Sequence, residues 1–241
     1  MESIDRLGWV DGFAVRPWGA LIGVRSNQTW LLQKIREEVM LPSWEVEALS
    51  YNFLFSFLVG GERRPGFRDF HLLFDGSARI ARSLDVEEVF ETFRTYFHRR
   101  VAQASNIPSV RAIALGIEGR AELFVGGHPD RLCPGWRCGR PTLLAPDHAY
   151  LTPKGLVQPY LNRPLPVDLD LPLEVESLPL GRVWVAGQDD AELSPARIVW
   201  HLFSHMETCV EPGLRLKCLS AAVSHSGVTG MECNVYVGLP G

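Results

Sequence analysis

Lysine is scarce in this chain, and its placement excludes a common class of nucleotide site. Among 24 lysines and arginines, only Lys34, Lys154 and Lys217 are lysines. A P-loop holds triphosphate through glycine amides, a lysine and a following serine or threonine. None of the lysines follows a glycine or precedes a serine or threonine. The chain therefore has no standard P-loop.

Other familiar signals are missing as well. There is no Gly-x-Gly-x-x-Gly, which excludes a standard dinucleotide fingerprint, and no Gly-x-Ser-x-Gly nucleophile elbow. No apolar run reaches the roughly 18 residues of a transmembrane helix. The start, MESIDRLGWVDGF, has no basic stretch followed by an apolar run, the pattern of a secretory signal. These absences predict a chain without a transmembrane segment or an export signal.

The cysteines and the net charge indicate the cellular location and the partners to expect. The five cysteines are odd in number and irregularly spaced, which argues against a disulfide framework. A reduced, cytoplasmic protein is the simpler interpretation. The net charge of −4 gives no reason to expect binding to nucleic acid.

The first half of the chain carries clear helix and strand patterns. After a strand ending near Asn27, a helix is expected with one apolar face, and Asn27 is expected to cap it. That face consists of Leu31, Leu32, Ile35 and Val39. The aromatic run 44–59 is typical of extended chain, and Asp75-Gly76 predicts a hairpin turn. A second helix is predicted over 85–105, with a capping box of Asp85 and Glu88.

The second half alternates strands with turns. Glu118-Gly119 and Lys154-Gly155 are expected to turn hairpins, and 164–179 reads as an extended crossing. A strand near 181–187, a helix from Pro195 and a further helix over 213–226 follow. The pattern predicts an α/β (α+β) fold, with an N-terminal domain at 1–106 and a C-terminal mixed-sheet domain at 107–241.

From about Val110 onward the order of elements resembles the HPr kinase/phosphorylase-like family, including relatives encoded beside peptide-modifying enzymes. The resembling segments are VRAIALGIEGRAELFVGG, TLLAPDHAYLTPKGLVQPY, NRPLP and LSPARIVWHLFSH, and WGALIGVRSNQTWLLQKIREEVMLPSW is similar to the N-terminal domain of those relatives. The resemblance implies a P-loop kinase-like domain with its phosphate loop after Gly126 and Gly127.

The chain departs from that family where the chemistry would be. Gly126-Gly127 leads to His128-Pro129-Asp130-Arg131, in which the proline lacks an N–H and the aspartate repels phosphate. Of the family's acidic pair, only Asp147 remains. The expectation is a degenerate, catalytically inactive relative with no cofactor. Such a protein would bind a protein or peptide partner and form a hetero-oligomer with it. Its role would be that of an accessory or assembly factor in a modification or biosynthetic complex.

Two alternatives remain open. A divergent ATP-dependent Ser/Thr phosphotransferase would use Asp147 as base and Arg131 or Arg140 in place of the lysine, since a guanidinium clamps phosphate bidentately. A zinc-stabilised binding module would use the four soft ligands of one region, although their spacing is not that of a Cys-x2-Cys knuckle. Those ligands are His128, Cys133, Cys138 and His148.

One further feature favours partner binding. The apolar run Tyr51–Val59 is mostly expected to be core, but seven tryptophans and twelve phenylalanines are enough to leave some at a surface, where aromatic residues anchor interfaces. The edge of an N-terminal sheet could accept an extended peptide as an added strand.

Overall fold

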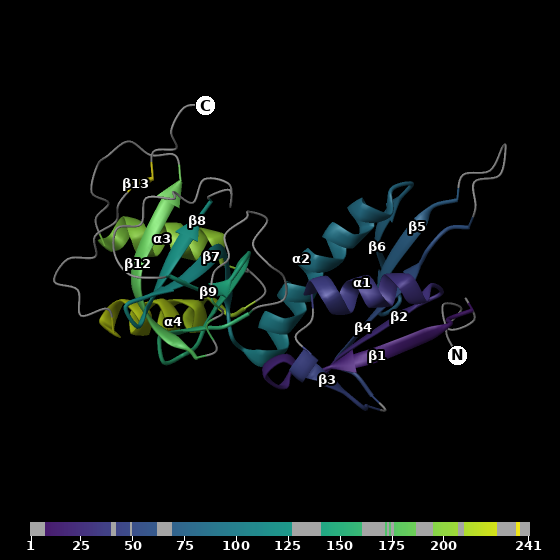
Figure 1. The fold of residues 1–241 in the computed structure, drawn as a ribbon, viewed down its shortest axis with the longest axis horizontal. Helices are drawn as coiled ribbons and strands as arrows, with labels where there is room; N and C mark the ends of the chain where they lie inside the picture. The colour runs from purple at the N-terminus through teal and green to yellow at the C-terminus, as the bar shows by residue number, and fades with distance from the viewer. Residues whose placement is uncertain are drawn as a thin grey trace. The chain divides into compact units, whose positions relative to one another are not determined.

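The structure is a computed structural model that describes residues 8–39, 42–48, 50–61, 69–126, 141–160, 172, 174, 176–186, 195–206, 210–225 and 235–236. The chain forms two compact units, 1–105 and 106–241 (Figure 1). The sequence had placed this boundary between residues 106 and 107. Each unit is mixed α/β, with a mixed sheet and helices among its described residues.

The first unit is a six-stranded sheet in the order β3-β1-β2-β4-β5-β6. Its strands are β1 (Asp11–Val15), β2 (Ile22–Ser26), β3 (Glu45–Val46), β4 (Phe53–Leu58), β5 (His71–Asp75) and β6 (Ala78–Ser83). Only β2 and β4 pair in parallel, and the helix α1 (Thr29–Val39) connects them as a crossover. The remaining pairs are antiparallel.

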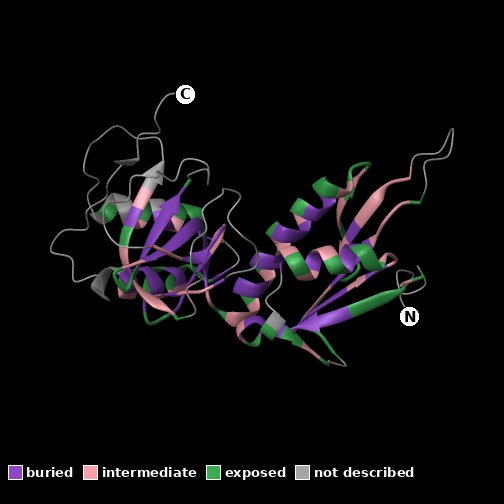
Figure 2. Ribbon diagram, in the orientation of Figure 1, coloured by how far each residue is buried: buried purple, intermediate pink, exposed green. Residues whose placement is uncertain are grey.

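Helices α1 and α2 (Val86–Ser105) cover the same face of this sheet. Phe93 of α2 meets Phe55 and Phe57 of β4 edge-on, with ring centroids 5.2 and 5.0 Å apart. Arg36 of α1 lies over Phe13 of β1, which shares this face because the register aligns Phe13, Val24 and Phe55. Both helices show a buried stripe beside an exposed one (Figure 2).

The expected apolar face of α1 is confirmed, and all four of its residues are fully buried. Asn27, however, does not serve as the expected cap. Its side-chain amide donates to the Val59 carbonyl at 2.9 Å and accepts from the Val59 N–H at 2.8 Å. Instead, the Gln28 N–H donates to the hydroxyl of Ser26. The side chain of Asn27 therefore joins β2 to the end of β4.

The N-terminus of α2 is capped through a relay. Asp85 accepts from the Glu87 N–H at 2.9 Å, as an N-cap residue does. The reciprocal bond from Glu88 does not reach Asp85 directly. The Asp85 N–H donates to Ser83 Oγ, and that hydroxyl donates to Glu88. Ser83 thus stands between the two partners of the expected capping box.

The second unit contains a closed five-stranded barrel in the order β7-β8-β12-β11-β10, with β10 returning to β7. Its strands are β7 (Ser109–Ile117), β8 (Arg120–Val125), β10 (His148–Leu151), β11 (Leu156–Gln158) and β12 (Leu178–Ala186). Two further strands, β9 (Thr142–Ala145) and β13 (Val235–Tyr236), pair with β7 and β12. The pairs of β12 with β8 and β13 are parallel, so the sheet is mixed.

Turns and helices complete this unit. Glu118 and Gly119 both have positive φ, as a two-residue hairpin between β7 and β8 requires. Gly155 also has positive φ, and a Cβ there would lie 2.5 Å from the backbone of Ala221. That residue belongs to α4 (Pro212–His225), which follows α3 (Pro195–His205). No helix among the described residues is long and apolar enough to cross a membrane.

Candidate functional site

The phosphate-loop region is described only at its beginning. Strand β8 ends at Val125, and Gly126 follows with φ +70°. The other residues proposed for this region lie outside the described residues, and they are Gly127, His128, Arg131, Cys133, Cys138 and Arg140. The expected loss of the phosphate cradle and the zinc alternative therefore stay predictions.

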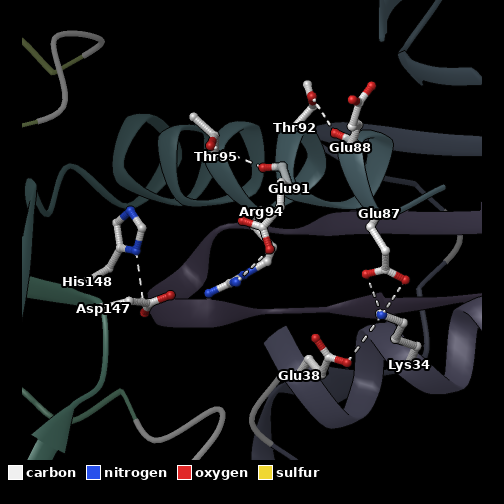
Figure 3. A network of polar contacts seen from close by, with 10 residues as sticks. All are labelled: Lys34, Glu38, Glu87, Glu88, Glu91, Thr92, Arg94, Thr95, Asp147 and His148. Atoms are coloured by element: carbon white, nitrogen blue, oxygen red, sulfur yellow. Dashed lines mark hydrogen bonds and ion pairs between the residues drawn. The ribbon is translucent and has the colours of Figure 1, made fainter. Parts of the chain in front are cut away.

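Asp147 and His148 lie at the corner between β9 and β10. The main-chain carbonyl of Asp147 accepts from the Ala112 N–H at 3.0 Å, which ties the corner to β7. The side chains face each other, with 3.4 Å between Asp147 Oδ1 and His148 Nδ1 (Figure 3). A carboxylate beside an imidazole can orient the ring and stabilise its protonated form. The sequence had assigned these residues to separate alternatives, whereas the structure makes them a pair.

The other polar network in Figure 3 joins the two helices of the first unit. Lys34 of α1 donates to both oxygens of Glu87 on α2, at 2.8 and 2.7 Å, and lies 3.6 Å from Glu38. Burial by itself would lower the pKa of Lys34, but the Glu87 hydrogen bond and the two carboxylate charges raise it above its usual value. Lys34 therefore stays charged and connects α1 to α2.

A buried carboxylate in the wall of the barrel is also accounted for. Glu122 of β8 is 7% exposed, and Trp184 of β12 donates its indole N–H to Glu122 at 2.7 Å. The Trp184 ring stacks on Phe124, with ring centroids 5.7 Å apart. Arg182 lies 3.8 Å from the same carboxylate. The hydrogen bond and the nearby charge offset the cost of burying Glu122.

The strongest candidate for function is the sheet face of the first unit that α1 and α2 leave uncovered. Because side chains alternate along a strand, Leu54 and Leu58 of β4 and Leu72 and Phe74 of β5 point away from both helices. All four are partly exposed. We call these four residues, with Tyr51, the open face.

Small residues form the floor at one end of this face. Ala14 pairs with Gly23 across β1 and β2, and Gly12 is two residues along β1 on the same side. The ring of Tyr51 lies over Gly23, where an added Cβ would come within 2.8 Å of Cγ and 2.9 Å of both Cδ atoms. Glycine is thus required at position 23 for the ring to lie there. Tyr51 is still 42% exposed.

A pocket of about 750 Å³ lies at this end of the sheet. Strand β3 pairs with β1 only at Val15↔Glu45 and Ala14↔Val46. The chain then leaves the sheet, and no described strand pairs with the rest of β1 on that side. The pocket is lined by Gly12, Phe13, Ala14, Glu45, Val46, Glu47, Ala48 and Tyr51.

Sequence reasoning singled out the Tyr51–Val59 run but missed the rest of this site. Glycines within strands signal that another group approaches the backbone closely. Gly12 and Gly23, in two consecutive apolar segments, carried that signal. Their relation to Tyr51 depends on the pairing of β1 with β2, which the sequence does not state.

A second exposed aromatic group lies on the helices of the second unit. Trp200 is 67% exposed and stacks on Phe203, with centroids 6.5 Å apart. Arg215 of α4 lies over the same Phe203 ring at 4.2 Å. Leu216 beside it is 51% exposed.

No family model, curated protein or solved structure matches this chain.

Proposed function

We propose that this protein is a non-catalytic accessory or assembly factor that binds a protein or peptide partner on the open face of its first unit. The observation that carries the proposal is that β4 has apolar side chains on both of its faces. Phe55 and Phe57 pack under α2, whereas Leu54 and Leu58 lie on the side that no described helix of this unit covers.

The pattern of side chains on this sheet differs from that of a sheet with one solvated face. A sheet with one solvated face normally places polar residues on that face, and strands apolar on both sides are typical of sheets covered twice. Here the side of β4 and β5 that no described helix of this unit covers carries Leu54, Leu58, Leu72 and Phe74. Ser56 lies between the two leucines, and its hydroxyl accepts a hydrogen bond from Arg25. Burying such side chains against a partner stabilises a complex by roughly 25 cal/mol per Å² of apolar area before the costs of association.

The sequence supports a protein that catalyses no phosphate transfer. A proline and an aspartate follow the double glycine, and no lysine is placed to neutralise a phosphate. We also propose that the second unit is related to HPr kinase-like proteins. In favour of that relationship, a glycine follows the end of β8, and β8 runs parallel to β12, an arrangement compatible with a strand that leads into a phosphate loop.

The experiment compares partner capture by the tagged full chain and two variants. Leu54→Arg places a charge on the open face, and Leu84→Arg makes the same change at a residue that is 46% exposed and lies between β6 and α2. A partner captured by the wild type and the Leu84 variant, but lost with Leu54→Arg, supports the proposal. Circular dichroism checks that both variants are folded. Equal capture by all three proteins contradicts the proposal.

The Asp147–His148 pair favours one second candidate, the divergent phosphotransferase. In that case Asp147 accepts the proton of the substrate hydroxyl, and the neighbouring imidazole lies 3.4 Å away to stabilise or relay charge. Calorimetric titration with magnesium-ATP separates the two candidates. Tight binding, together with phosphate transfer that Asp147→Asn abolishes, would replace the accessory role with this one.

A further inference from the structure

We infer that the pocket beside β1 binds an extended, basic peptide segment, whose main chain adds to β1 at Gly12 and whose arginine or lysine side chain lies between Tyr51 and Glu47. This inference rests on the proposed function and names the chemistry of the partner at one end of the open face.

The strand edge supplies the main-chain part of the site. The Arg16 N–H donates to the Trp44 carbonyl at 2.8 Å, so alternate residues of β1 turn their N–H and C=O groups toward the β3 side. Ala14 faces Val46 there, and Gly12 is the next residue in that series. The Gly12 N–H is held by the side chain of Asp11 at 2.8 Å, an acceptor that an incoming carbonyl can replace.

The length of β3 leaves room for such a strand. Continuing its register would place chain opposite Phe13 and Gly12, but Glu47 and Ala48 leave the sheet and line the pocket instead. A peptide in line with β3 would occupy that register, which no described strand fills. Strand addition of this kind gives affinity through main-chain hydrogen bonds and specificity through alternate side chains.

The side chain opposite Gly12 would point to the open face, because paired residues of adjacent strands share a face. Ala14 and Gly23 leave the floor there free of bulky side chains, and the exposed ring of Tyr51 lies beside it. Arg25 pairs with Gly12 on the same face, and its guanidinium group is turned to the Ser56 hydroxyl and to the ring of Trp9. A cation over an aromatic ring is attracted by the negative face of the ring. This arrangement favours an arginine or lysine over an apolar side chain.

The carboxylates around the pocket have the sign that attracts a cation. Glu45 and Glu47 line it, and Asp11 lies next to Gly12. Glu45 is already paired with Arg36, through N–O contacts of 3.1 and 3.3 Å. Glu47 is exposed and forms no ion pair with another described residue. It is therefore the carboxylate placed to pair with an incoming cation.

The test uses the full chain and three fluorescein-labelled synthetic octapeptides of alternating valine and threonine. They carry arginine, glutamate or proline at one central position. Anisotropy is expected to show the arginine peptide binding at least about tenfold more tightly than the glutamate peptide. The proline peptide is expected to lose binding, because proline cannot donate to a strand edge. Added salt should weaken binding of the arginine peptide, because salt screens exposed charge pairs.

Matched variants locate the site. Glu47→Lys should lower the affinity for the arginine peptide at least about fivefold. Glu37→Lys makes the same charge change on the exposed side of α1, and it should change that affinity by no more than about twofold. Tyr51→Ala should also weaken binding, and Tyr51→Phe should retain it, since the ring is kept. Each variant is checked for folding by circular dichroism.

Three results overturn the inference. One is equal binding of the arginine and glutamate peptides, another is equal weakening by Glu47→Lys and Glu37→Lys, and the third is no binding of any peptide up to about 1 mM. None of these results affects the capture experiment with Leu54→Arg. If that experiment succeeds while the peptides fail, the open face binds a partner but the pocket does not take a basic strand.

Discussion

The contact between Asp75 and Arg100 provides a sharp test of how the first unit is held together. Asp75 ends β5 on the face toward the helices, and its side chain is 6% exposed. Arg100 of α2 donates through Nε to Asp75 Oδ2 at 2.7 Å, and its guanidinium lies 4.5 Å from the ring centre of Phe53. Arg100→Met keeps most of the apolar stem and removes the charge.

The expected loss follows from the burial of the two partners. Breaking a buried pair costs about 3–5 kcal/mol because one charge stays buried alone, whereas exposed pairs contribute about 0–1 kcal/mol. The Arg100 side chain is 28% exposed, so water reaches the site in part. We therefore expect Arg100→Met to lower the free energy of unfolding of this unit by about 2–3 kcal/mol. Asp75→Leu combined with Arg100→Met should recover most of that loss, since no unpaired charge remains.

The measurement is native-state hydrogen exchange of the full chain at rising urea, read by mass spectrometry on peptides from β5 and α2. Region-specific reading is needed because a chain with two units need not unfold in one step. Arg99→Met is the control, since Arg99 is exposed one residue earlier on α2, and it should change stability by less than about 0.5 kcal/mol. The reasoning is refuted if Arg100→Met and Arg99→Met lose the same stability, or if the double variant is as unstable as Arg100→Met.

Three further outcomes test the core and the second unit. Phe93→Ala, which empties a fully buried site against two phenylalanines of β4, should cost about 3–5 kcal/mol in the same exchange experiment, and a loss below about 1 kcal/mol contradicts the packing. Gly155→Ala should destabilise the second unit by about 2 kcal/mol or more in urea unfolding, because it combines a positive φ with a Cβ 2.5 Å from the backbone of Ala221; an unchanged midpoint would show that the turn can shift. Burial raises the pKa of the Cys218 thiol, although the charge of Lys217 acts to lower it. Iodoacetamide should therefore label this residue slowly at neutral pH and rapidly in urea. Equal labelling rates, measured by residue-resolved mass spectrometry, would rule out its burial.

Local patterns were sufficient for many elements of this fold. The apolar face of α1 and the span of α2 followed from helical periodicity, since a helix in a globular protein buries one stripe. The turn at Glu118-Gly119 followed from the conformations that a two-residue hairpin demands. These features depend on residues close together in sequence, so their signals could be read without the rest of the chain.

Asn27 shows where such reading fails. Its type and place suit a helix cap, and only the parallel pairing of β2 with β4 brings Val59 close enough to bind its amide. Ser83 was overlooked for a related reason, because its hydroxyl enters the cap of α2 from the preceding strand. In both cases the polar side chain can form hydrogen bonds with several groups, and the tertiary structure decides which of them lies close enough.

The sequence by itself therefore determined the helices and the hairpin turns, since each depends on the order and type of nearby residues. It also lacks the P-loop motif. Tertiary structure alone decided that the strands of the second unit close into a barrel, and that α1 and α2 share one face of the first sheet. It also placed the Tyr51 ring over Gly23, 28 residues away in the chain. These features arise from pairings between distant strands, whose register a local pattern does not specify.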